Sequence, residues 1–212
     1  MSALTSAFAA ERGGDLAFAD DSGQRTWAET DERVNRLVHA FRDTGIVGGD
    51  TIAVVAGNCN EWFETMLACA CSGVVFVPVN WHLVASEIAY QLGDSGSKAV
   101  IVGHQFAEET AKALDDERST AVETRIVIGA GSDSRFTGFE EFLANGSPDE
   151  PDAQSFGGPM FYTSGTTGNP KGVRSTMSSM PEGTDPAVWQ FIGGRFSELV
   201  EGIGTTVLCG PV

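Results

Sequence analysis

Apolar residues recur along the chain at helical spacing in some stretches and at strand spacing in others. Between 34 and 41 they fall at i, i+3, i+4 and i+7, which places them on one face of a helix. Thr26 and Glu29 stand just before this stretch in the T-x-x-E pattern of a capping box, and Gly45 follows it at a position suited to a helix end. We therefore predict a helix between 26 and 45 with start and stop signals.

Short apolar runs, rich in β-branched residues and bounded by turn formers, alternate with further amphipathic stretches. The pattern predicts strands near 16–19, 51–56, 74–79, 99–102, 125–128, 173–176 and 205–209. It predicts helices near 61–72, 85–92, 107–116 and 139–143, a short one before residue 16, and a last one between 189 and 203. Strands and helices that alternate at this spacing indicate βαβ units. The expected fold class is α/β, with a mainly parallel sheet flanked by helices.

A polar connection that contains prolines follows the helix predicted near 139–143. Residues 145–152 read Asn-Gly-Ser-Pro-Asp-Glu-Pro-Asp, a composition typical of loops and linkers. The stretch 145–158 is a candidate internal boundary. We interpret it as a loop that leads into the strand before residue 163.

The most distinctive stretch is 161–172, Phe-Tyr-Thr-Ser-Gly-Thr-Thr-Gly-Asn-Pro-Lys-Gly. Its glycines allow successive backbone N–H groups to point into one concavity, and its hydroxyls and lysine add donors and a positive charge. Hydrogen bonds to charged groups contribute about 1.5–3 kcal/mol each, so several together can hold a polyphosphate. The candidate binding residues are Thr163, Ser164, Gly165, Thr166, Thr167, Gly168 and Lys171. The apolar pair Phe161-Tyr162 suits the end of a buried strand that fixes one end of this loop.

The Walker A phosphate loop does not match this stretch. That loop has the spacing G-x-x-x-x-G-K-[ST] and begins a helix with its lysine. Counted from Gly165, Pro170 takes the place of the second glycine, and Gly172 follows the lysine. Proline donates no N–H and disfavours helix at the residue before it. The stretch is therefore a different loop; the alternative, a surface turn that binds nothing, fits a segment of this order less well.

Composition and charge narrow the range of partners. The chain of 212 residues has 29 acidic and 13 basic residues and a formal net charge of −16. This balance argues against nucleic acid or an anionic membrane as the main partner. Because the Debye length is about 8 Å at physiological ionic strength, Lys171 inside a pocket would affect a bound phosphate more than distant carboxylates do.

The cysteines and histidines show no metal-ligand spacing. Cys59, Cys69, Cys71 and Cys209 include no C-x-x-C pair, and the histidines are scattered. We expect reduced, mostly buried thiols and a cytoplasmic protein. We also expect no signal peptide and no membrane span, because the apolar runs are only as long as strands.

The stretch 162–172 resembles the signature loop of the adenylate-forming (AMP-binding) superfamily, which includes acyl-CoA synthetases, aryl-CoA ligases, luciferases and peptide-synthetase adenylation domains. Other segments agree in order along the chain: 26–45 resembles the early helix of the family, 73–80 its G-x-V-x-V-P-x-N segment, and 87–90 its E-I-x-Y helix. Gly210-Pro211 is similar to the start of the next motif. The resemblance implies that 1–212 form the N-terminal portion of the large AMP-binding domain, truncated before the C-terminal lid.

The resemblance also implies the chemistry. A carboxylate substrate attacks the α-phosphate of ATP, pyrophosphate leaves, and the thiol of coenzyme A takes the acyl group from the acyl-adenylate. Thr163 through Gly168 would hold the β- and γ-phosphates, and Lys171 would help to neutralise them, with Mg²⁺ as Lewis acid. The catalytic lysine and the magnesium-binding acid of the family would lie outside this chain. We therefore assign no catalytic or metal-binding residue and expect the 212-residue chain alone to be inactive.

The expected function is the ATP-binding fragment of an acyl-CoA synthetase of the fatty-acid–CoA ligase branch. Two alternatives stay open: an adenylating enzyme with a carrier-protein acceptor, and a non-catalytic module that binds a nucleotide or a partner. A truncated domain can also expose apolar surface that favours self-association. The chain departs from the family where His82 replaces arginine and where Val84-Ala85 replaces Thr-Pro, a pair that helps a helix to begin.

Overall fold

The computed structural model describes residues 5–130, 133–163 and 169–175. The predicted strand at 205–209 and the helix between 189 and 203 lie outside these residues. The described helices are α1 (Thr5–Arg12), α2 (Trp27–Asp43), α3 (Asn60–Ser72), α4 (Ala85–Ser95), α5 (Ala107–Leu114) and α6 (Phe139–Ala144). The described strands are β1 (Leu16–Asp20), β2 (Gly23–Thr26), β3 (Thr51–Val55), β4 (Val75–Pro78), β5 (Ser97–Gly103), β6 (Thr124–Ile128), β7 (Thr137–Gly138), β8 (Met160–Thr163) and β9 (Lys171–Arg174).

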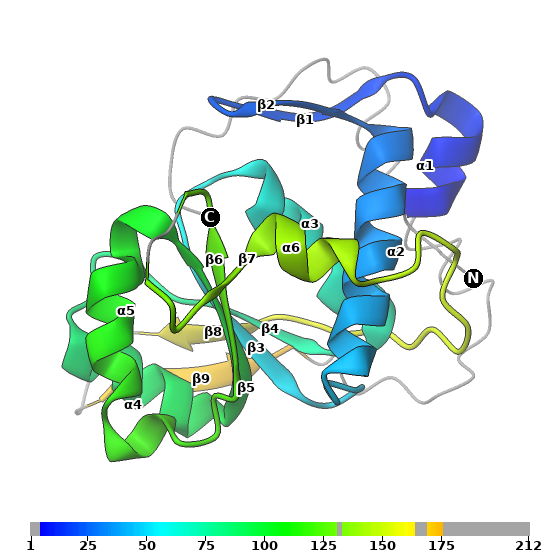
Figure 1. Cartoon of the computed structure of the whole chain (residues 1–212). Coiled ribbons are helices and arrows are strands. Elements are labelled where there is room, and N and C mark those ends of the chain that lie inside the picture. The colour runs from blue at the N-terminus through cyan, green and yellow to red at the C-terminus, as the bar shows by residue number, and fades with distance from the viewer. Residues whose placement is uncertain (1–4, 131–132, 164–168, 176–212) are drawn as a thin grey trace.

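A five-stranded parallel sheet in the order β4-β3-β5-β6-β7 forms the centre of the fold (Figure 1). Alternate residues of its strands point to opposite faces, as the pleat requires. Ile52, Val54 and Ile101 face the core under α2, α3 and α6. Ala53, Val55 and Val100 face the core under α4 and α5. The predicted α/β class with a parallel sheet flanked by helices is confirmed, and both faces of the sheet are covered.

The signals for the helix between 26 and 45 act as predicted. The Thr26 hydroxyl accepts a hydrogen bond from the Glu29 N–H at 3.3 Å, and the Glu29 carboxylate accepts one from the Thr26 N–H at 2.8 Å. These reciprocal bonds satisfy two N–H groups that the start of a helix leaves free. At the other end Gly45 has φ 79°, a conformation that favours glycine.

The start of α4 is capped although Val84-Ala85 replaces the usual Thr-Pro. The Val84 N–H donates to the Glu87 carboxylate at 3.1 Å, and the Ala85 N–H donates to the carboxylate of Glu109 on α5 at 2.7 Å. Carboxylates near a helix N-terminus are also favoured by the helix dipole. Two glutamates therefore replace the missing hydroxyl, and one of them ties α4 to α5.

The polar connection after α6 follows the surface of α2 before it reaches the sheet. Arg36 of α2 donates to the carbonyl oxygen of Gly146 at 3.0 Å, and Arg42 donates to that of Ala153 at 3.3 Å. Further on, the Gly157 N–H donates to the Ala70 carbonyl of α3 at 3.0 Å. The candidate boundary at 145–158 stays a prediction, although along this route the connection is hydrogen-bonded to the helices beside it.

Gly157 marks the closest approach of this connection to the core, and we predict that Gly157→Ala destabilises the fold. A methyl group there would overlap the carbonyl oxygens of Val74 and Cys69, which are backbone atoms that cannot rotate away. Overpacking of this kind costs about 1–3 kcal/mol or more, so chemical denaturation should give a lower free energy of unfolding by about 3 kcal/mol. Gly14→Ala is the matched control, because a methyl group at Gly14 meets no atom within 4 Å. Equal stability of the two variants would contradict the close packing.

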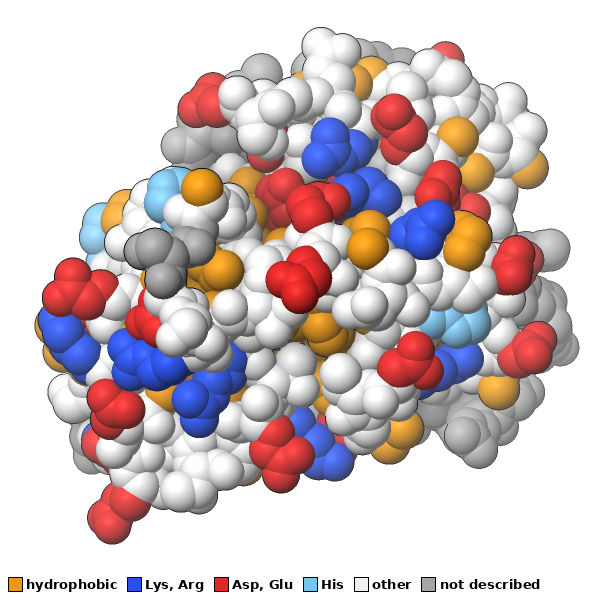
Figure 2. Space-filling view, viewed as in Figure 1, with side chains coloured by type: hydrophobic (Ala, Val, Ile, Leu, Met, Phe, Trp, Pro, Cys, Tyr) orange, Lys and Arg blue, Asp and Glu red, His pale blue; other side chains and the backbone are white. Residues whose placement is uncertain are grey.

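Charged side chains of both signs cover the surface. On the face drawn in Figure 2, Lys and Arg side chains are interspersed with Asp and Glu. Within the described part of the chain, none of the helices has the length and apolar character needed to cross a membrane.

Candidate functional site

The site predicted from the sequence lies on a hairpin of β8 and β9. The two strands pair antiparallel, and their register places Thr163 opposite Lys171 at the open end of the ladder. The structure thus brings together the first and last of the predicted phosphate-binding residues. The residues between them in that prediction, Ser164, Gly165, Thr166, Thr167 and Gly168, lie outside the described residues.

The root of the hairpin is attached to the β4 edge of the central sheet. The Phe76 N–H of β4 donates to the Gly158 carbonyl at 3.3 Å, and Phe76 forms a parallel bridge with Pro159. The Ser175 N–H donates back to the Pro159 carbonyl at 2.9 Å, which closes the base of the hairpin. Arg174 reaches the Thr51 hydroxyl of β3 at 3.4 Å. The base of the β8–β9 hairpin is therefore fixed to the central sheet.

The expectation of a buried strand at Phe161-Tyr162 is wrong for Phe161. The strand is present, but the Phe161 side chain is 52% exposed, and its cross-strand partner Val173 is 55% exposed. A two-stranded hairpin has two faces, and the face that carries Tyr162 is the one that packs against the described part of the chain. Strand β9 also begins at Lys171, earlier than the predicted 173–176, and Thr176 lies outside the described residues.

Helix α4 holds the packed face of the hairpin through two tyrosines. The Tyr90 hydroxyl donates to the Pro170 carbonyl at 2.9 Å, and the Tyr162 hydroxyl donates to the Asp94 carboxylate at 2.7 Å. Burial and the hydrogen bond to Asp94 raise the pKa of Tyr162 above its ordinary value, so this phenol stays protonated as a donor. These contacts join segments about seventy to eighty residues apart, and the sequence analysis did not predict them.

Lys171 is the cation of the site. Its side chain is exposed, and it forms no ion pair with the described acidic residues, although ion pairs engage Lys98 and Lys112. The Thr163 hydroxyl reaches the backbone carbonyl of Lys171 at 3.4 Å across the ladder. A lysine that none of the described carboxylates neutralises can interact with an anion that enters beside the hairpin.

Comparison with known proteins decides the family. The family model described as "AMP-binding enzyme" matches residues 6–209. The chain belongs to the AMP-binding enzyme family. It is 32% identical over 186 residues to a 3-oxocholest-4-en-26-oate–CoA ligase of Rhodococcus rhodochrous. The matched region covers 84% of this chain and 32% of that protein.

Two further matches extend the comparison of this AMP-binding chain. A fatty acid–[acyl-carrier-protein] ligase, ScoC of Streptomyces coeruleorubidus, is 33% identical over 148 residues, 70% of this chain and 27% of that protein. The solved structure of a Mycobacterium tuberculosis fatty acyl CoA synthetase matches with a TM-score of 0.70 and 28% identity, over 83% of this chain and 34% of that one. The chain thus spans about a third of the length of the curated relatives it matches.

The described cysteines of this AMP-binding chain are free thiols of low reactivity. Burial raises the pKa of Cys59 and of Cys71 to about 12, and it raises the pKa of the fully buried Cys69 as well. These thiols stay protonated at neutral pH and are poor nucleophiles and metal ligands. Cys209 lies outside the described residues. Among the residues that the structure describes, no group of three His, Cys, Asp or Glu side chains could hold a metal ion.

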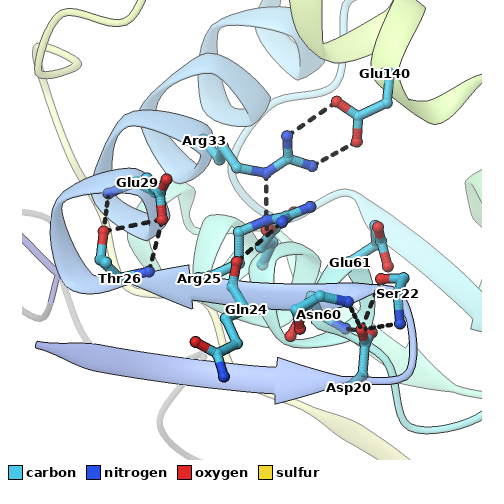
Figure 3. A network of polar contacts seen from close by, with 12 residues as sticks. Asp20, Ser22, Gln24, Arg25, Thr26, Glu29, Arg33, Asn60, Glu61 and Glu140 are labelled. Atoms are coloured by element: carbon cyan, nitrogen blue, oxygen red, sulfur yellow. Dashed lines mark hydrogen bonds and ion pairs between the residues drawn. The ribbon is translucent and has the colours of Figure 1, made fainter.

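A cluster of charged residues around the buried Glu64 was not predicted from the sequence. Arg33 of α2 donates to Glu64 of α3 at 2.8 Å and forms a two-bonded ion pair with Glu140 of α6 at 2.7 and 2.9 Å (Figure 3). Arg25 of β2 reaches the same Glu64 oxygen at 3.3 Å. The Glu64 side chain is fully buried. These four residues therefore tie the N-terminal hairpin and three helices together on the α2 side of the sheet.

Proposed function

We propose that this chain supplies the ATP-binding part of an acyl-CoA synthetase that activates a carboxylic acid, with fatty acids as the expected class. The observation that carries the proposal is the register of β8 and β9, which pairs Thr163 with Lys171 at the two ends of the hydroxyl- and glycine-rich loop. Membership of the AMP-binding family supports it, and so do the relatives, whose names describe ligases of steroid and fatty acids.

In the proposed reaction, a carboxylate oxygen of the substrate attacks the α-phosphorus of ATP. A bond forms between that oxygen and phosphorus, the bond to the β-phosphate breaks, and pyrophosphate leaves with the bonding electrons. The thiolate of coenzyme A then attacks the acyl carbon, and AMP leaves. The substrate brings its own nucleophile, so the protein mainly has to position ATP and neutralise the pyrophosphate.

Each predicted residue has a part in holding the leaving group. The backbone N–H groups and hydroxyls from Thr163 to Gly168 would donate to the β- and γ-phosphates, and the Lys171 ammonium would neutralise their charge. Mg²⁺ is expected from the resemblance to the family, but the described residues offer no ligand cluster for it, and no step is assigned to it.

ATP–pyrophosphate exchange tests this function in the complete product of the gene that encodes this chain. We expect exchange that depends on a carboxylic acid, with medium- and long-chain fatty acids among the active substrates, because only acyl-adenylate formation returns labelled pyrophosphate to ATP. The 212-residue chain alone is expected to show no exchange, since it spans about a third of its relatives. If a broad panel of acids gives no exchange with the complete product, the function is refuted.

A carrier protein is the second candidate acceptor, because ScoC is named as a ligase that acts on an acyl-carrier protein. Thioester formation should be measured with coenzyme A and, separately, with a carrier protein that bears its pantetheine arm. Product with coenzyme A supports the first candidate, and product only with the carrier protein supports the second. ATP binding without exchange would instead indicate a non-catalytic module.

The remaining expectations belong to the same proposal. A ligase of this type would work in the cytoplasm, where ATP and coenzyme A are available. The exposed side chains of Phe161 and Val173 give the hairpin an apolar face that can support self-association.

A further inference from the structure

The only two tyrosines of the chain meet at the junction of the hairpin with α4. Their ring centroids lie 6.5 Å apart with an interplanar angle of 76°, an edge-to-face contact. Tyr90 comes from α4 and Tyr162 from β8, and both rings are partly buried. We call this pair, with its hydrogen-bond partners Pro170 and Asp94, the tyrosine clamp.

Tyr90 controls the backbone just before the cation of the site. Its hydroxyl donates to the Pro170 carbonyl at 2.9 Å. That carbonyl belongs to the planar peptide unit that also contains the N–H of Lys171, so a bond that orients one orients the other. The pyrrolidine ring of Pro170 fixes φ on the other side of the same carbonyl. The hydrogen bond from α4 therefore orients the peptide unit that leads into Lys171.

Tyr162 attaches strand β8 to the same helix, α4. Its hydroxyl donates to the Asp94 carboxylate at 2.7 Å, and its ring lies against Gly172, its partner across the ladder. A methyl group on Gly172 would come within 3.1 Å of the Tyr162 ring and would overlap the end of the Met160 side chain. Glycine at this position thus leaves room for the Tyr162 ring and the Met160 side chain beside β9.

Helix α4 is a rigid support for both contacts. Ile88, Ala89 and Leu92 on its inner face are buried against the central sheet. A phosphate-binding side chain works best when the element that orients it cannot move. Lys171 has no ion pair with the described residues that would hold it in place. The hydrogen bond from Tyr90 to Pro170 instead anchors the backbone beside it to the buried helix α4.

We propose that Tyr90 is a positioning residue for Lys171, and that the clamp sets the orientation of that lysine toward the phosphates of ATP. This inference rests on the proposed function, because it assigns Lys171 an ATP phosphate as its partner. Tyr90 itself touches no reacting atom in this scheme. Its effect on catalysis passes through the Pro170–Lys171 peptide unit.

A double-mutant cycle in the complete gene product tests the proposal. Tyr90→Phe removes one hydroxyl and keeps the ring, and it should raise the KM for ATP about fivefold, the order of one neutral hydrogen bond, with the KM for the acid unchanged. In a Lys171→Ala background the same change should have no further effect, because its target is gone. Equal effects in the two backgrounds, or no effect in the first, would overturn the proposal.

Thr44→Val is the matched control. Its hydroxyl donates to the Phe41 carbonyl at 2.8 Å, so the variant loses a bond of the same kind, on the α2 side of the sheet. It should leave the KM for ATP unchanged.

Hydrogen exchange separates failure of the clamp from failure of the proposed function. In Tyr90→Phe without nucleotide, amides at 171–175 should exchange faster, while those of α4 keep their rates. Unchanged rates at 171–175 would refute the clamp even if the enzyme is active. If hydrogen exchange at 171–175 is faster but the protein catalyses no ATP–pyrophosphate exchange with any acid, the clamp is supported as a backbone anchor. Its role toward ATP is then refuted.

Discussion

Replacing Arg33 with methionine is expected to lower the free energy of unfolding by about 3–5 kcal/mol, because removing one partner of a buried ion pair leaves the other charge uncompensated. Methionine keeps much of the apolar stem and removes the guanidinium of a side chain that is only 14% exposed. Glu64, fully buried, would keep Arg25 at 3.3 Å, and its second oxygen already has no hydrogen-bond partner among the described residues. Thermal and urea denaturation measure the loss.

The loss in Arg33→Met should depend on pH. Burial already raises the pKa of Glu64 above its ordinary value of 4.5, against the lowering effect of Arg33. Without Arg33 the pKa of Glu64 rises further, so the folded state retains a proton that the unfolded state releases. A group of this kind contributes stability below its unfolded pKa and loses it as pH rises toward its folded pKa. The deficit relative to the unmodified protein should therefore be smaller at pH 4 than at pH 7.

Lys112→Ala provides the control for this experiment. Lys112 also forms two ion pairs, with Glu108 and Glu109, but they lie on the exposed surface of α5. Solvent-exposed pairs of this kind contribute little to stability, so this variant should unfold close to the unmodified protein. If both variants lower the free energy of unfolding by a similar, small amount, burial does not make the ion pairs of Arg33 more stabilising than exposed ones, and the prediction is wrong.

Replacing Lys171 with alanine is expected to have the largest effect on activity. In the complete gene product, Lys171→Ala should lower kcat/KM for ATP about 10-fold to 100-fold, the range that corresponds to one hydrogen bond to a charged group. The KM for the carboxylic acid should change little, because the lysine is assigned to the phosphates. Steady-state exchange kinetics at varied ATP and fixed acid measure the effect.

Lys112→Ala again serves as the control, because it removes an exposed lysine that lies on α5 and not on the hairpin. Lys171→Arg is a second comparison, since it keeps the charge but changes its shape, and it should retain part of the activity. If Lys171→Ala leaves kcat/KM for ATP unchanged, Lys171 does not interact with the phosphates of ATP, and its assignment to the site is wrong.

Local signals in the sequence were sufficient for most of the fold. The capping box of Thr26 and Glu29 and the β-branched runs of β3 and β4 each depend on neighbours within a few residues, so a single sequence contains them. Strand β2 was missed because its sequence, Gly-Gln-Arg-Thr, carries no apolar alternation. It forms because β1 supplies a partner across a tight turn.

Contacts between distant segments were beyond the reach of the sequence pattern. Arg33 and Glu140 are 107 residues apart, and Tyr90 and Pro170 are 80 apart, so no spacing rule relates them. The exposure of Phe161 was also missed, because an apolar residue in a strand is buried only if another layer covers its face. The residue types of the candidate site were recognisable in the sequence, and the structure adds the pairing of Thr163 with Lys171.

Hydrogen exchange with and without ATP and magnesium tests the central claim most directly, since it locates the nucleotide on the complete gene product without a substitution. If the hairpin and its loop hold the polyphosphate, ATP should slow exchange in peptides that cover 162–175, and more strongly than AMP does, because AMP lacks the β- and γ-phosphates. Peptides from α6 should keep their rates. Slowing that is equal for ATP and AMP, or that spares 162–175, would contradict the account.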